Sequence, residues 1–364
     1  MKLLVTGSTG FLGQAVVREA LRLGHTVRAA VRPATDVERV WPGGHARLEI
    51  ARIDLRRRQG LADACRGVDA VIHLAAVKMG DFYDQMVGTV VATENLLAAM
   101  DEAGCGRLVL CSTFSVYDYM RPRSGRVVDE DFPLEPDPDA RDEYAKTKLL
   151  QEQMVRDHAE STGMSLTVIR PGVIYGADNL PNGWTGQQLG EKRWVRIGAN
   201  AQVPLTYVEH CAEAHVLAAV KDEAVGRTYN IVDADPPTQR RYIKLLQKKF
   251  VPRPRVFPVN WTLARSVARL GWLFNRVFLG GRAKVPSILV PCRLHARAKP
   301  YRYNTQRPTQ ELGWSMRWSL EEAVDRALQI ERGELVLELP GGESQTTPTS
   351  VQPPAADRAE AASV

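Results

Sequence analysis

Two kinds of apolar pattern alternate along the first half of the chain: short continuous runs and longer segments with helical spacing. KLLVT at 2–6 is a short apolar run, whereas FLGQAVVREALRLG at 11–24 has apolar residues at helical spacing and ends in Gly24, a common C-cap residue. These patterns predict a strand followed by a helix. The same alternation predicts further strands at 26–32, 46–54, 69–76, 106–113 and 165–172, and helices at 84–103 and 140–162.

Such alternation is typical of an α/β fold, because parallel strands need crossover helices that cover both faces of the sheet. We therefore expect a Rossmann-type, doubly wound parallel sheet in residues 1–172. The pattern weakens after Gly172, although a strand is predicted at 227–232 and a helix at 240–250. We expect a smaller C-terminal substrate-binding lobe over 173–332, with the chain returning partly to the first domain around 203–232.

Three glycines lie where the first strand meets the first helix. In VTGSTGFLG, Gly7 allows a tight turn, Gly10 lets the backbone approach a pyrophosphate, and Gly13 lets the helix pack closely on the strand. The helix N-terminus then offers free N–H groups and a positive dipole end to the anion. A purely structural turn is the alternative, but the strand–turn–helix context predicts a dinucleotide-binding site.

The end of the second strand indicates which dinucleotide is bound. NAD sites typically have an acidic residue there, whereas this chain has Val31 followed by Arg32. A guanidinium binds a 2′-phosphate that a carboxylate would repel, so we expect NADP(H), with NAD(H) as the alternative. Arg32 could instead be a solvated strand-end residue. Asp54 is a candidate partner for the adenine amino group, or a simple turn residue.

Charge is unevenly distributed along the chain. The 364 residues carry a net charge of +6, yet residues 236–310 contain seventeen Lys or Arg and no Asp or Glu, which leaves the rest at −11. Such a division suggests an anionic partner for the basic segment. Residues 333–364, rich in Pro, Ser, Thr and Ala, predict a disordered tail.

Other features of the sequence indicate a cytoplasmic protein. No apolar run is long enough to span a membrane, and the strand that follows Met1 directly leaves no room for a signal peptide. The five cysteines are odd in number and include no C-x-x-C, which argues against a disulfide framework and against a metal site.

The segment DEYAKTKLLQEQ at 142–153 places Tyr144 and Lys148 one turn apart on the same helix face. Taken alone, this spacing is close to chance and fits an ordinary polar face. LCSTFSVY, about thirty residues upstream, gives the pair a context, because it ends a predicted parallel strand, where ligands of such sheets usually bind.

The motifs together resemble the extended short-chain dehydrogenase/reductases, also called the epimerase/dehydratase family, over roughly residues 1–332. The resemblance rests on TGSTGFLG, IDL, HLAA, STFSVY, YAKTK, RPGVIYG, YNIVD and ELGWSMRWSLEEAV in this order. It implies that Thr113, Tyr144 and Lys148 act on a carbinol or carbonyl carbon facing the nicotinamide, and that His73 to Ala76 line the cofactor. The implied cofactor contacts are Gly7, Thr9, Gly10, Phe11, Leu12, Gly13, Arg32, Asp54, Leu55, Leu74, Ala75, Ala76, Tyr144, Lys148, Pro171 and Val173.

Two positions depart from the family pattern. An Asn common in the helix after the fourth strand is Thr89 here, which puts a supporting hydrogen bond in doubt, and the Gly usually following VY is Asp118.

The catalytic roles agree with general chemistry. Tyrosine, with a pKa of about 10, is a poor base at neutral pH, and lowering that pKa by about 2–3 units takes about 3–4 kcal/mol. We expect Lys148, beside a cationic nicotinamide ring, to supply this effect.

The substrate class is less sharply indicated. Phe114 and Ser115 stand where some dehydratases of the family have an Asp-Glu pair, so we do not expect water elimination, while epimerisation stays open. WTLARSVARLGWLFNRVFLGG at 261–281 is an amphipathic helix with an arginine face. It suits a membrane surface, or it packs on the protein's own core. Hydrophobic segments here look like those of the 3β-hydroxysteroid dehydrogenase-like branch, which handles apolar alcohols and ketones.

We therefore predict an NADP(H)-dependent alcohol dehydrogenase or ketone reductase with an apolar small-molecule substrate, such as a sterol or a long-chain keto acid. A nucleotide-sugar epimerase is the second enzyme hypothesis. An NADPH-sensing or RNA-binding protein on the same fold is a hypothesis of another class, which the intact Thr113, Tyr144 and Lys148 argue against. Peripheral membrane contact through 261–279 follows from the amphipathic helix, and a homodimer through helices 84–103 and 140–162 follows by analogy with the family.

Overall fold

The computed structural model describes residues 1–180, 187–188, 193–198, 200–278, 280 and 290–340. Its centre is a seven-stranded sheet with the order β12-β7-β5-β4-β1-β2-β3, in which all neighbouring strands run parallel. The predicted α/β class and doubly wound parallel sheet are confirmed. The strands of this sheet are β1 (Lys2–Thr6), β2 (Thr26–Val31), β3 (Leu48–Arg52), β4 (Ala70–His73), β5 (Arg107–Cys111), β7 (Ser165–Pro171) and β12 (Thr228–Ile231).

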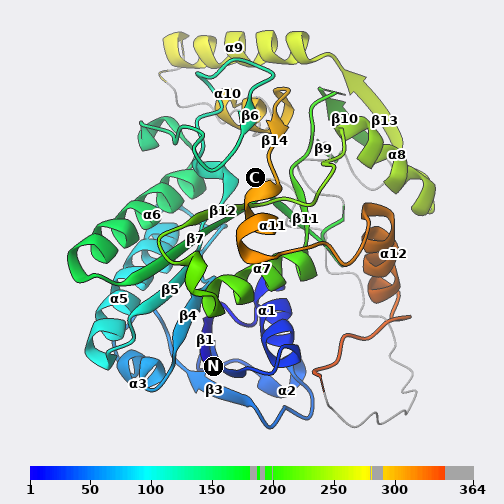
Figure 1. Cartoon of the computed structure of the whole chain (residues 1–364). Coiled ribbons are helices and arrows are strands. Elements are labelled where there is room, and N and C mark those ends of the chain that lie inside the picture. The colour runs from blue at the N-terminus through cyan, green and yellow to red at the C-terminus, as the bar shows by residue number, and fades with distance from the viewer. Residues whose placement is uncertain (181–186, 189–192, 199, 279, 281–289, 341–364) are drawn as a thin grey trace.

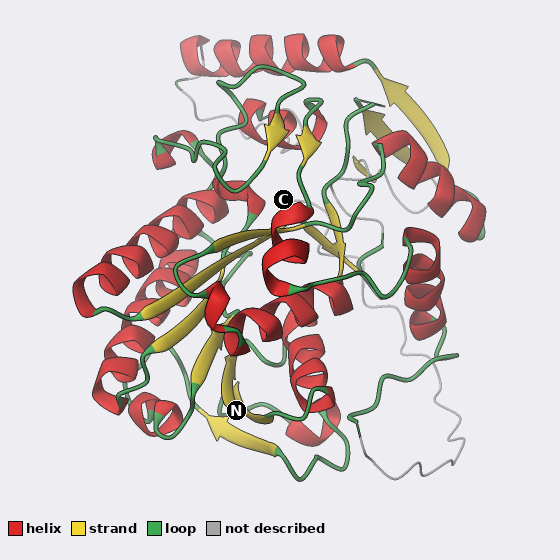
Figure 2. Cartoon of the chain, in the orientation of Figure 1, coloured by secondary structure: helices red, strands yellow, loops and turns green. Residues whose placement is uncertain are grey.

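Helices cover both faces of this sheet (Figures 1 and 2). Successive residues of β1 point to opposite faces, so Leu3 and Val5 join one core and Leu4 joins the other. The first core lies under α1 (Phe11–Arg22) and α7 (Val208–Val220). The second lies under α3 (Leu61–Cys65), α5 (Ala92–Ala103) and α6 (Glu143–Thr162).

The helix predicted at 84–103 differs from the structure. The chain forms α4 (Phe82–Gln85), a π-helical turn at Met86–Val91 and then α5. Gly88 sits in that turn against Val77, where a Cβ would lie 2.2 Å from Val77 Cγ2. The π turn therefore fits the helix against the loop after β4, a type of irregularity that is frequent at functional sites.

The C-terminal part of the chain interlocks with the sheet. After β7 the chain leaves for β8 (Val173–Tyr175), which pairs in parallel with β11 (Leu205–Tyr207), and it returns through α7 to β12, which joins the central sheet beside β7. The other elements of this part are β9 (Gln187–Gln188), β10 (Arg193–Ile197), α8 (Gln239–Lys249), β13 (Arg255–Val259), α9 (Trp261–Phe278), α10 (Pro291–Ala298), β14 (Arg302–Tyr303), α11 (Gln306–Leu312) and α12 (Leu320–Glu331).

Two further features complete the arrangement. The short strand β6 (Val127–Val128) pairs with β14, which ties the segment after β5 to a segment far along the chain. None of the helices in the described part of the chain is long and apolar enough to cross a bilayer. Disorder was predicted for residues 333–364, and of these, residues 341–364 lie outside the described part of the chain.

Candidate active site

The predicted cofactor-binding and catalytic positions all line one pocket of about 1090 Å³. The pocket lies at the carboxyl ends of β1, β4 and β5, where the strand order reverses between β1 and β4. Of the predicted HLAA segment, Leu74, Ala75 and Ala76 line the pocket, whereas His73 is buried and does not line it. The lining includes Gly7, Thr9, Gly10, Phe11, Leu12, Gly13, Arg32, Asp54, Leu55, Leu74, Ala75, Ala76, Thr113, Tyr144, Lys148, Pro171 and Val173.

The glycine turn forms one end of the pocket. Gly7 has a φ of +67°, and a Cβ there would lie 2.9 Å from the Ala75 nitrogen. A Cβ on Gly13 would lie 2.0 Å from the Gly7 carbonyl oxygen, so α1 can approach the turn only with glycine at that position. Helix α1 begins after Gly10 with no side-chain cap on its first N–H groups. These residues therefore fit a dinucleotide pyrophosphate, which needs a close backbone and free donors.

The pocket continues past the ends of β2 and β3. Arg32 follows β2 directly and is exposed, and no described carboxylate lies within ion-pair distance of it. Asp54 pairs with Arg56, with 2.6 Å between its Oδ2 and the Arg56 Nη2. Hydrogen bonds from Arg56 lower the pKa of Asp54 to about 2. This end of the pocket therefore contains the Arg32 guanidinium, which has no carboxylate partner among the described residues, and the Asp54 carboxylate, which pairs with Arg56.

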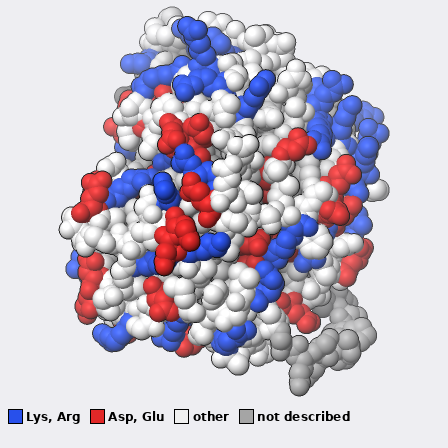
Figure 3. All heavy atoms as spheres, viewed as in Figure 1, with Lys and Arg blue, Asp and Glu red and all other residues white. Residues whose placement is uncertain are grey.

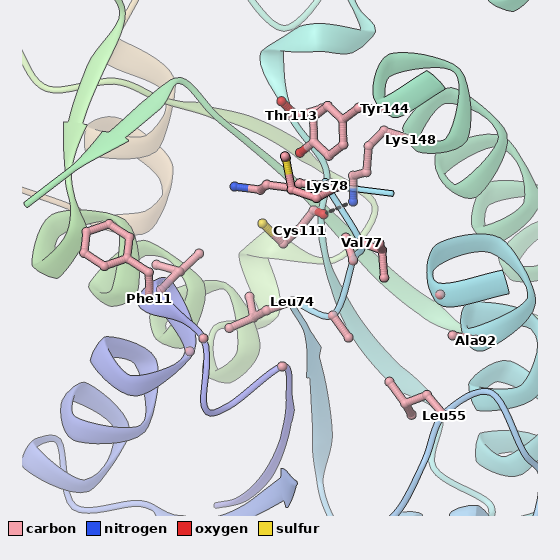
Figure 4. Close-up of a pocket in the computed structure, with 18 of the residues that line it drawn as sticks. Phe11, Leu55, Leu74, Val77, Lys78, Ala92, Cys111, Thr113, Tyr144 and Lys148 are labelled. Atoms are coloured by element: carbon pink, nitrogen blue, oxygen red, sulfur yellow. Dashed lines mark hydrogen bonds between the residues drawn. The ribbon is translucent and has the colours of Figure 1, made fainter. Parts of the chain in front are cut away.

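The opposite end of the pocket brings Thr113, Tyr144 and Lys148 together (Figure 4). Asp142 caps α6 by accepting from the Ala145 N–H at 3.3 Å, which starts the helix one residue before Tyr144. Thr113 follows β5, and its hydroxyl accepts from the Ser115 N–H at 3.2 Å and faces the pocket beside Tyr144. Three side chains, one after β5 and two from α6, therefore line the same end of the pocket.

The expected lowering of the Tyr144 pKa is not what the isolated chain has. Burial, the largest influence, raises the pKa of Tyr144 above its ordinary value, and the neighbouring Thr113 hydroxyl opposes that rise. Lys148 Nζ donates to the Cys111 carbonyl oxygen at 2.6 Å and to Gln151 Oε1. Burial lowers the pKa of Lys148 to about 8. Because its pKa is raised, the Tyr144 phenol is protonated at neutral pH, which suits a proton donor.

A buried chain of hydrogen bonds behind Lys148 was not foreseen from the sequence. Gln151, fully buried, donates from Nε2 to Thr93 Oγ1 at 2.7 Å. His73 Nε2 lies 2.8 Å from the same hydroxyl, and His73 Nδ1 lies 2.7 Å from Thr6 Oγ1. Burial lowers the pKa of His73 to about 3, so the ring is neutral at working pH. Gln151 recurs at helical spacing after Tyr144 and Lys148, which was the available signal.

Thr89 and Asp118, the two departures from the family pattern, both form hydrogen bonds with the backbone. Thr89 Oγ1 accepts a hydrogen bond from the Val77 N–H at 3.0 Å, so the helix after β4 still supports the loop that lines the pocket. Asp118 is buried, and its carboxylate accepts from the Met120 N–H at 2.8 Å and from the Arg121 N–H at 3.1 Å. Both side chains bind backbone groups that would otherwise be unpaired.

A buried ion pair fixes the segment that carries Thr113. Arg170 of β7 and Glu152 of α6 approach to 2.5 Å, and Ser112 donates to the same carboxylate at 2.5 Å. Burial favours a raised pKa for Glu152, but Arg170, Arg156 and Ser112 outweigh it and hold that pKa at about 2. The sheet, α6 and the β5 loop are thus joined through one carboxylate.

A sequence profile of the NAD dependent epimerase/dehydratase family matches residues 3–232. The chain belongs to this family. It is 31% identical over 339 residues to the 2-alkyl-3-oxoalkanoate reductase of Stenotrophomonas maltophilia, with 90% of this chain and 98% of that protein covered. It is 26% identical to the Mus musculus sterol-4-alpha-carboxylate 3-dehydrogenase, decarboxylating, with 90% of each covered.

The fold also matches solved structures. The Bacillus cereus UDP-glucuronic acid 4-epimerase in complex with UDP-glucuronic acid and NAD superposes with a TM-score of 0.68 at 19% identity, and the match covers 92% of this chain and 100% of that one. The chain is thus an enzyme of the extended short-chain dehydrogenase/reductase type, similar to reductases, dehydrogenases and epimerases.

Proposed function

We propose that this enzyme interconverts a ketone and an alcohol on an apolar substrate, with NADP(H) as cofactor. The observation that carries the proposal is the meeting of Thr113, Tyr144 and Lys148 in the pocket that also contains the glycine turn. A proton donor and a dinucleotide-binding turn in one pocket are what reduction of a carbonyl by hydride requires.

The chain's own residues supply the acid and its surroundings, while a bound nicotinamide dinucleotide supplies the hydride. In the direction of reduction, the Tyr144 phenol donates its proton to the substrate's carbonyl oxygen. The Thr113 hydroxyl orients that oxygen and stabilises the charge that develops on it. The Lys148 ammonium, held by the Cys111 carbonyl and Gln151, adds a positive field that favours the phenolate left behind.

NADP(H) is favoured by the charges at the end of β2. Arg32 is exposed there without a described carboxylate partner, and Asp54 is already paired with Arg56. A 2′-phosphate would meet a free guanidinium and no free carboxylate. Arg32→Ala is therefore expected to weaken NADPH binding by about 1.5–3 kcal/mol and NADH binding far less, measured by fluorescence titration. Equal affinity of the unaltered enzyme for both cofactors would contradict the preference.

The substrate side of the pocket belongs, in this proposal, to residues 173–332. Ile174 and Asn179 line the pocket there, and the two similar enzymes act, by their names, on an alkyl-substituted oxoalkanoate and on a sterol carboxylate. Both names combine an apolar body with a carboxylate. Lys78 lines the pocket, and in Figure 4 its side chain extends across it near Thr113 and Tyr144. We assign Lys78 to a carboxylate on the substrate.

The experiment is NADPH oxidation measured with long-chain 3-oxo acids, with the matching methyl esters and with UDP-sugars. We expect turnover of the 3-oxo acids. Lys78→Gln should raise KM about tenfold for the acid, leave KM for the ester unchanged, and leave KM for NADPH unchanged, because only the acid carries the charge that Lys78 pairs with. A raised KM for NADPH would place Lys78 at the cofactor instead. Epimerisation of a UDP-sugar without net NADPH oxidation would replace the reductase proposal.

Two expectations stay predictions. A homodimer through α5 and α6 follows from analogy alone. A nucleic-acid-binding role is not favoured by the pocket, since its polar residues are arranged for proton transfer, and an RNA-binding titration run beside the reductase assay tests it.

A further inference from the structure

Helix α9 exposes the large apolar side chains that a surface helix normally buries. Leu263, Leu270 and Val277 are 60%, 67% and 62% exposed, and Val267 and Phe274, which recur at the same helical spacing, are also exposed. Together they form one row, which we call the apolar row (Leu263, Val267, Leu270, Phe274 and Val277). A contiguous exposed row of this size on a soluble protein marks a contact with something else.

The side of α9 that packs on the protein is made of small residues. Ala264 and Ala268 are buried against Ile197 of β10 and against Leu294 and Ala298 of α10. Helix α9 thus packs on the protein through its alanines, while its large apolar side chains stay exposed. Figure 1 shows the helix at the outer edge of the molecule, beyond α10.

A second row along α9 is basic. Arg265, Arg269 and Arg276 are exposed, and no described carboxylate lies within ion-pair distance of them. The Arg276 guanidinium lies over the Trp272 ring, 5.3 Å from its centroid. Figure 3 shows Lys and Arg gathered over this end of the molecule, and residues 236–310 contain no Asp or Glu. The contact surface is therefore both apolar and positively charged.

We propose that α9 docks on the surface of an anionic lipid bilayer, lying in the plane of the interface. A helix with Leu and Phe on one face and arginines on the other has the pattern of interfacial helices, whose apolar face enters the headgroup boundary. Trp272 lies beside the arginine row, against Arg276, at the level of the headgroups, which the arginines attract. Apolar insertion and charge attraction act on the same helix.

Other occupants fit this surface less well. A second copy of the chain would bring two segments without acidic residues face to face, so their charges would repel. A nucleic acid would match the arginines but leave the apolar row in water. A bilayer with anionic headgroups is the partner that satisfies both rows.

A succession of contacts links α9 to the helix that carries the proposed catalytic tyrosine. Helix α10, on which α9 rests, contributes Arg293, which lies 3.3 Å from the carboxylate of Asp142. Asp142 is the N-cap of α6, two residues before Tyr144. An apolar substrate dissolved in the bilayer would thus be close to its enzyme. The docking itself does not depend on the reductase proposal, because it is measured without substrate.

The test is flotation of the full-length protein with two kinds of vesicle, pure phosphatidylcholine and phosphatidylcholine mixed with phosphatidylglycerol, at low and at high salt. We expect flotation with the anionic vesicles at low salt and release at high salt, because a Debye length of about 10 Å or less screens the attraction. Recovery in the soluble fraction under every condition, or equal flotation with neutral vesicles at both salts, would overturn the proposal.

Variants separate the two rows. Arg265→Gln, Arg269→Gln and Arg276→Gln combined should weaken binding about hundredfold, since each basic residue near an anionic surface contributes about fivefold. The matched control, Arg39→Gln, Arg57→Gln and Arg332→Gln, removes the same charge from exposed positions on other elements and should leave binding within about threefold. Equal losses in the two triple variants would show a net-charge effect and overturn docking through α9.

Two further readouts keep the result specific. The emission of Trp272, the most exposed tryptophan among the described residues, should shift to the blue on vesicle binding, and Trp272→Phe should remove that shift. Leu270→Glu with Phe274→Glu should abolish flotation while leaving the oligomeric state in ultracentrifugation unchanged. Conversion of an oligomer to a monomer by this pair would mean that a second copy covers the apolar row, and would overturn the proposal.

Discussion

Helices α6 and α9 are of similar length, 20 and 18 residues, but they differ in which of their side chains are buried and which are exposed. Helix α6 buries Lys148, Gln151 and Glu152, each with a hydrogen-bond partner, whereas α9 exposes its Leu, Val and Phe side chains. These two sets of residues reverse the usual division between an apolar inside and a polar outside, although α6 also buries Leu149 and Val155. In α6 the reversal builds a proposed catalytic site, and in α9 it leaves a surface for a partner.

The energetic consequences of the two reversals differ. A buried charge without its partner is costly because nothing replaces the lost hydration, so α6 should be sensitive to small changes. An exposed apolar residue loses nothing in solution when it becomes polar. Substitutions in α6 should therefore change activity or folding, and those in α9 should change neither.

Tyr144→Phe is expected to have the largest effect. Removal of the phenol leaves no proton donor at the carbonyl oxygen, so kcat should fall by about a thousandfold or more, while the Kd for NADPH stays within about twofold. Steady-state NADPH oxidation and a binding titration measure the two quantities. Wild-type turnover by the variant would show that another group donates the proton.

Glu152→Gln should have the largest effect on folding. It leaves Arg170 buried without its counter-charge, and the free energy of unfolding should fall by about 3–5 kcal/mol in urea titrations. The pKa of Glu152 is lowered, so its stabilising contribution is complete above the ordinary glutamate pKa and is lost as the pH falls toward about 2. As the pH falls toward about 2, the unaltered protein should therefore lose this part of its free energy of unfolding, and Glu152→Gln should not.

Gln151 should determine the pH dependence of the reaction. Lys148, with a pKa of about 8, is charged below that pH and neutral above it, so kcat/KM for reduction should fall as the pH rises through about 8. Gln151→Leu removes an acceptor from the ammonium and should move this fall to lower pH by about one unit or more. Gln151→Glu should move it to higher pH. Shifts in the same direction in both variants would indicate a merely structural role for Gln151.

The smallest effect is expected in α9. Leu270→Ser and Phe274→Ser should change the free energy of unfolding by no more than about 0.5 kcal/mol each, since both side chains are already exposed. A loss of about 2 kcal/mol or more in either variant would show that the apolar row packs against the protein and would remove the contrast between the two helices.

Much of the fold and site followed from local patterns in the sequence. Short apolar runs and helical spacings located the seven strands of the sheet and the covering helices α1, α5 and α6, but not α3 or α7. Gly7 and Gly13 marked the turn after β1, because a Cβ at either position would collide with backbone atoms. Tyr144 and Lys148 could be paired because four residues make one helical turn. These features depend on neighbours in sequence, which a sequence displays directly.

Only the tertiary structure decided the rest. In the π turn at Met86–Val91, Gly88 packs against Val77 of the loop after β4, and burial raises the pKa of Tyr144. Gln151 contacts Lys148 on its own helix, but its link to His73 depends on the packing of α6 against β4. The sequence predicted an amphipathic helix at 261–279, yet both of its faces had potential partners. Which face packs inward depends on the surface offered by α10, a property of the folded chain that no local period contains.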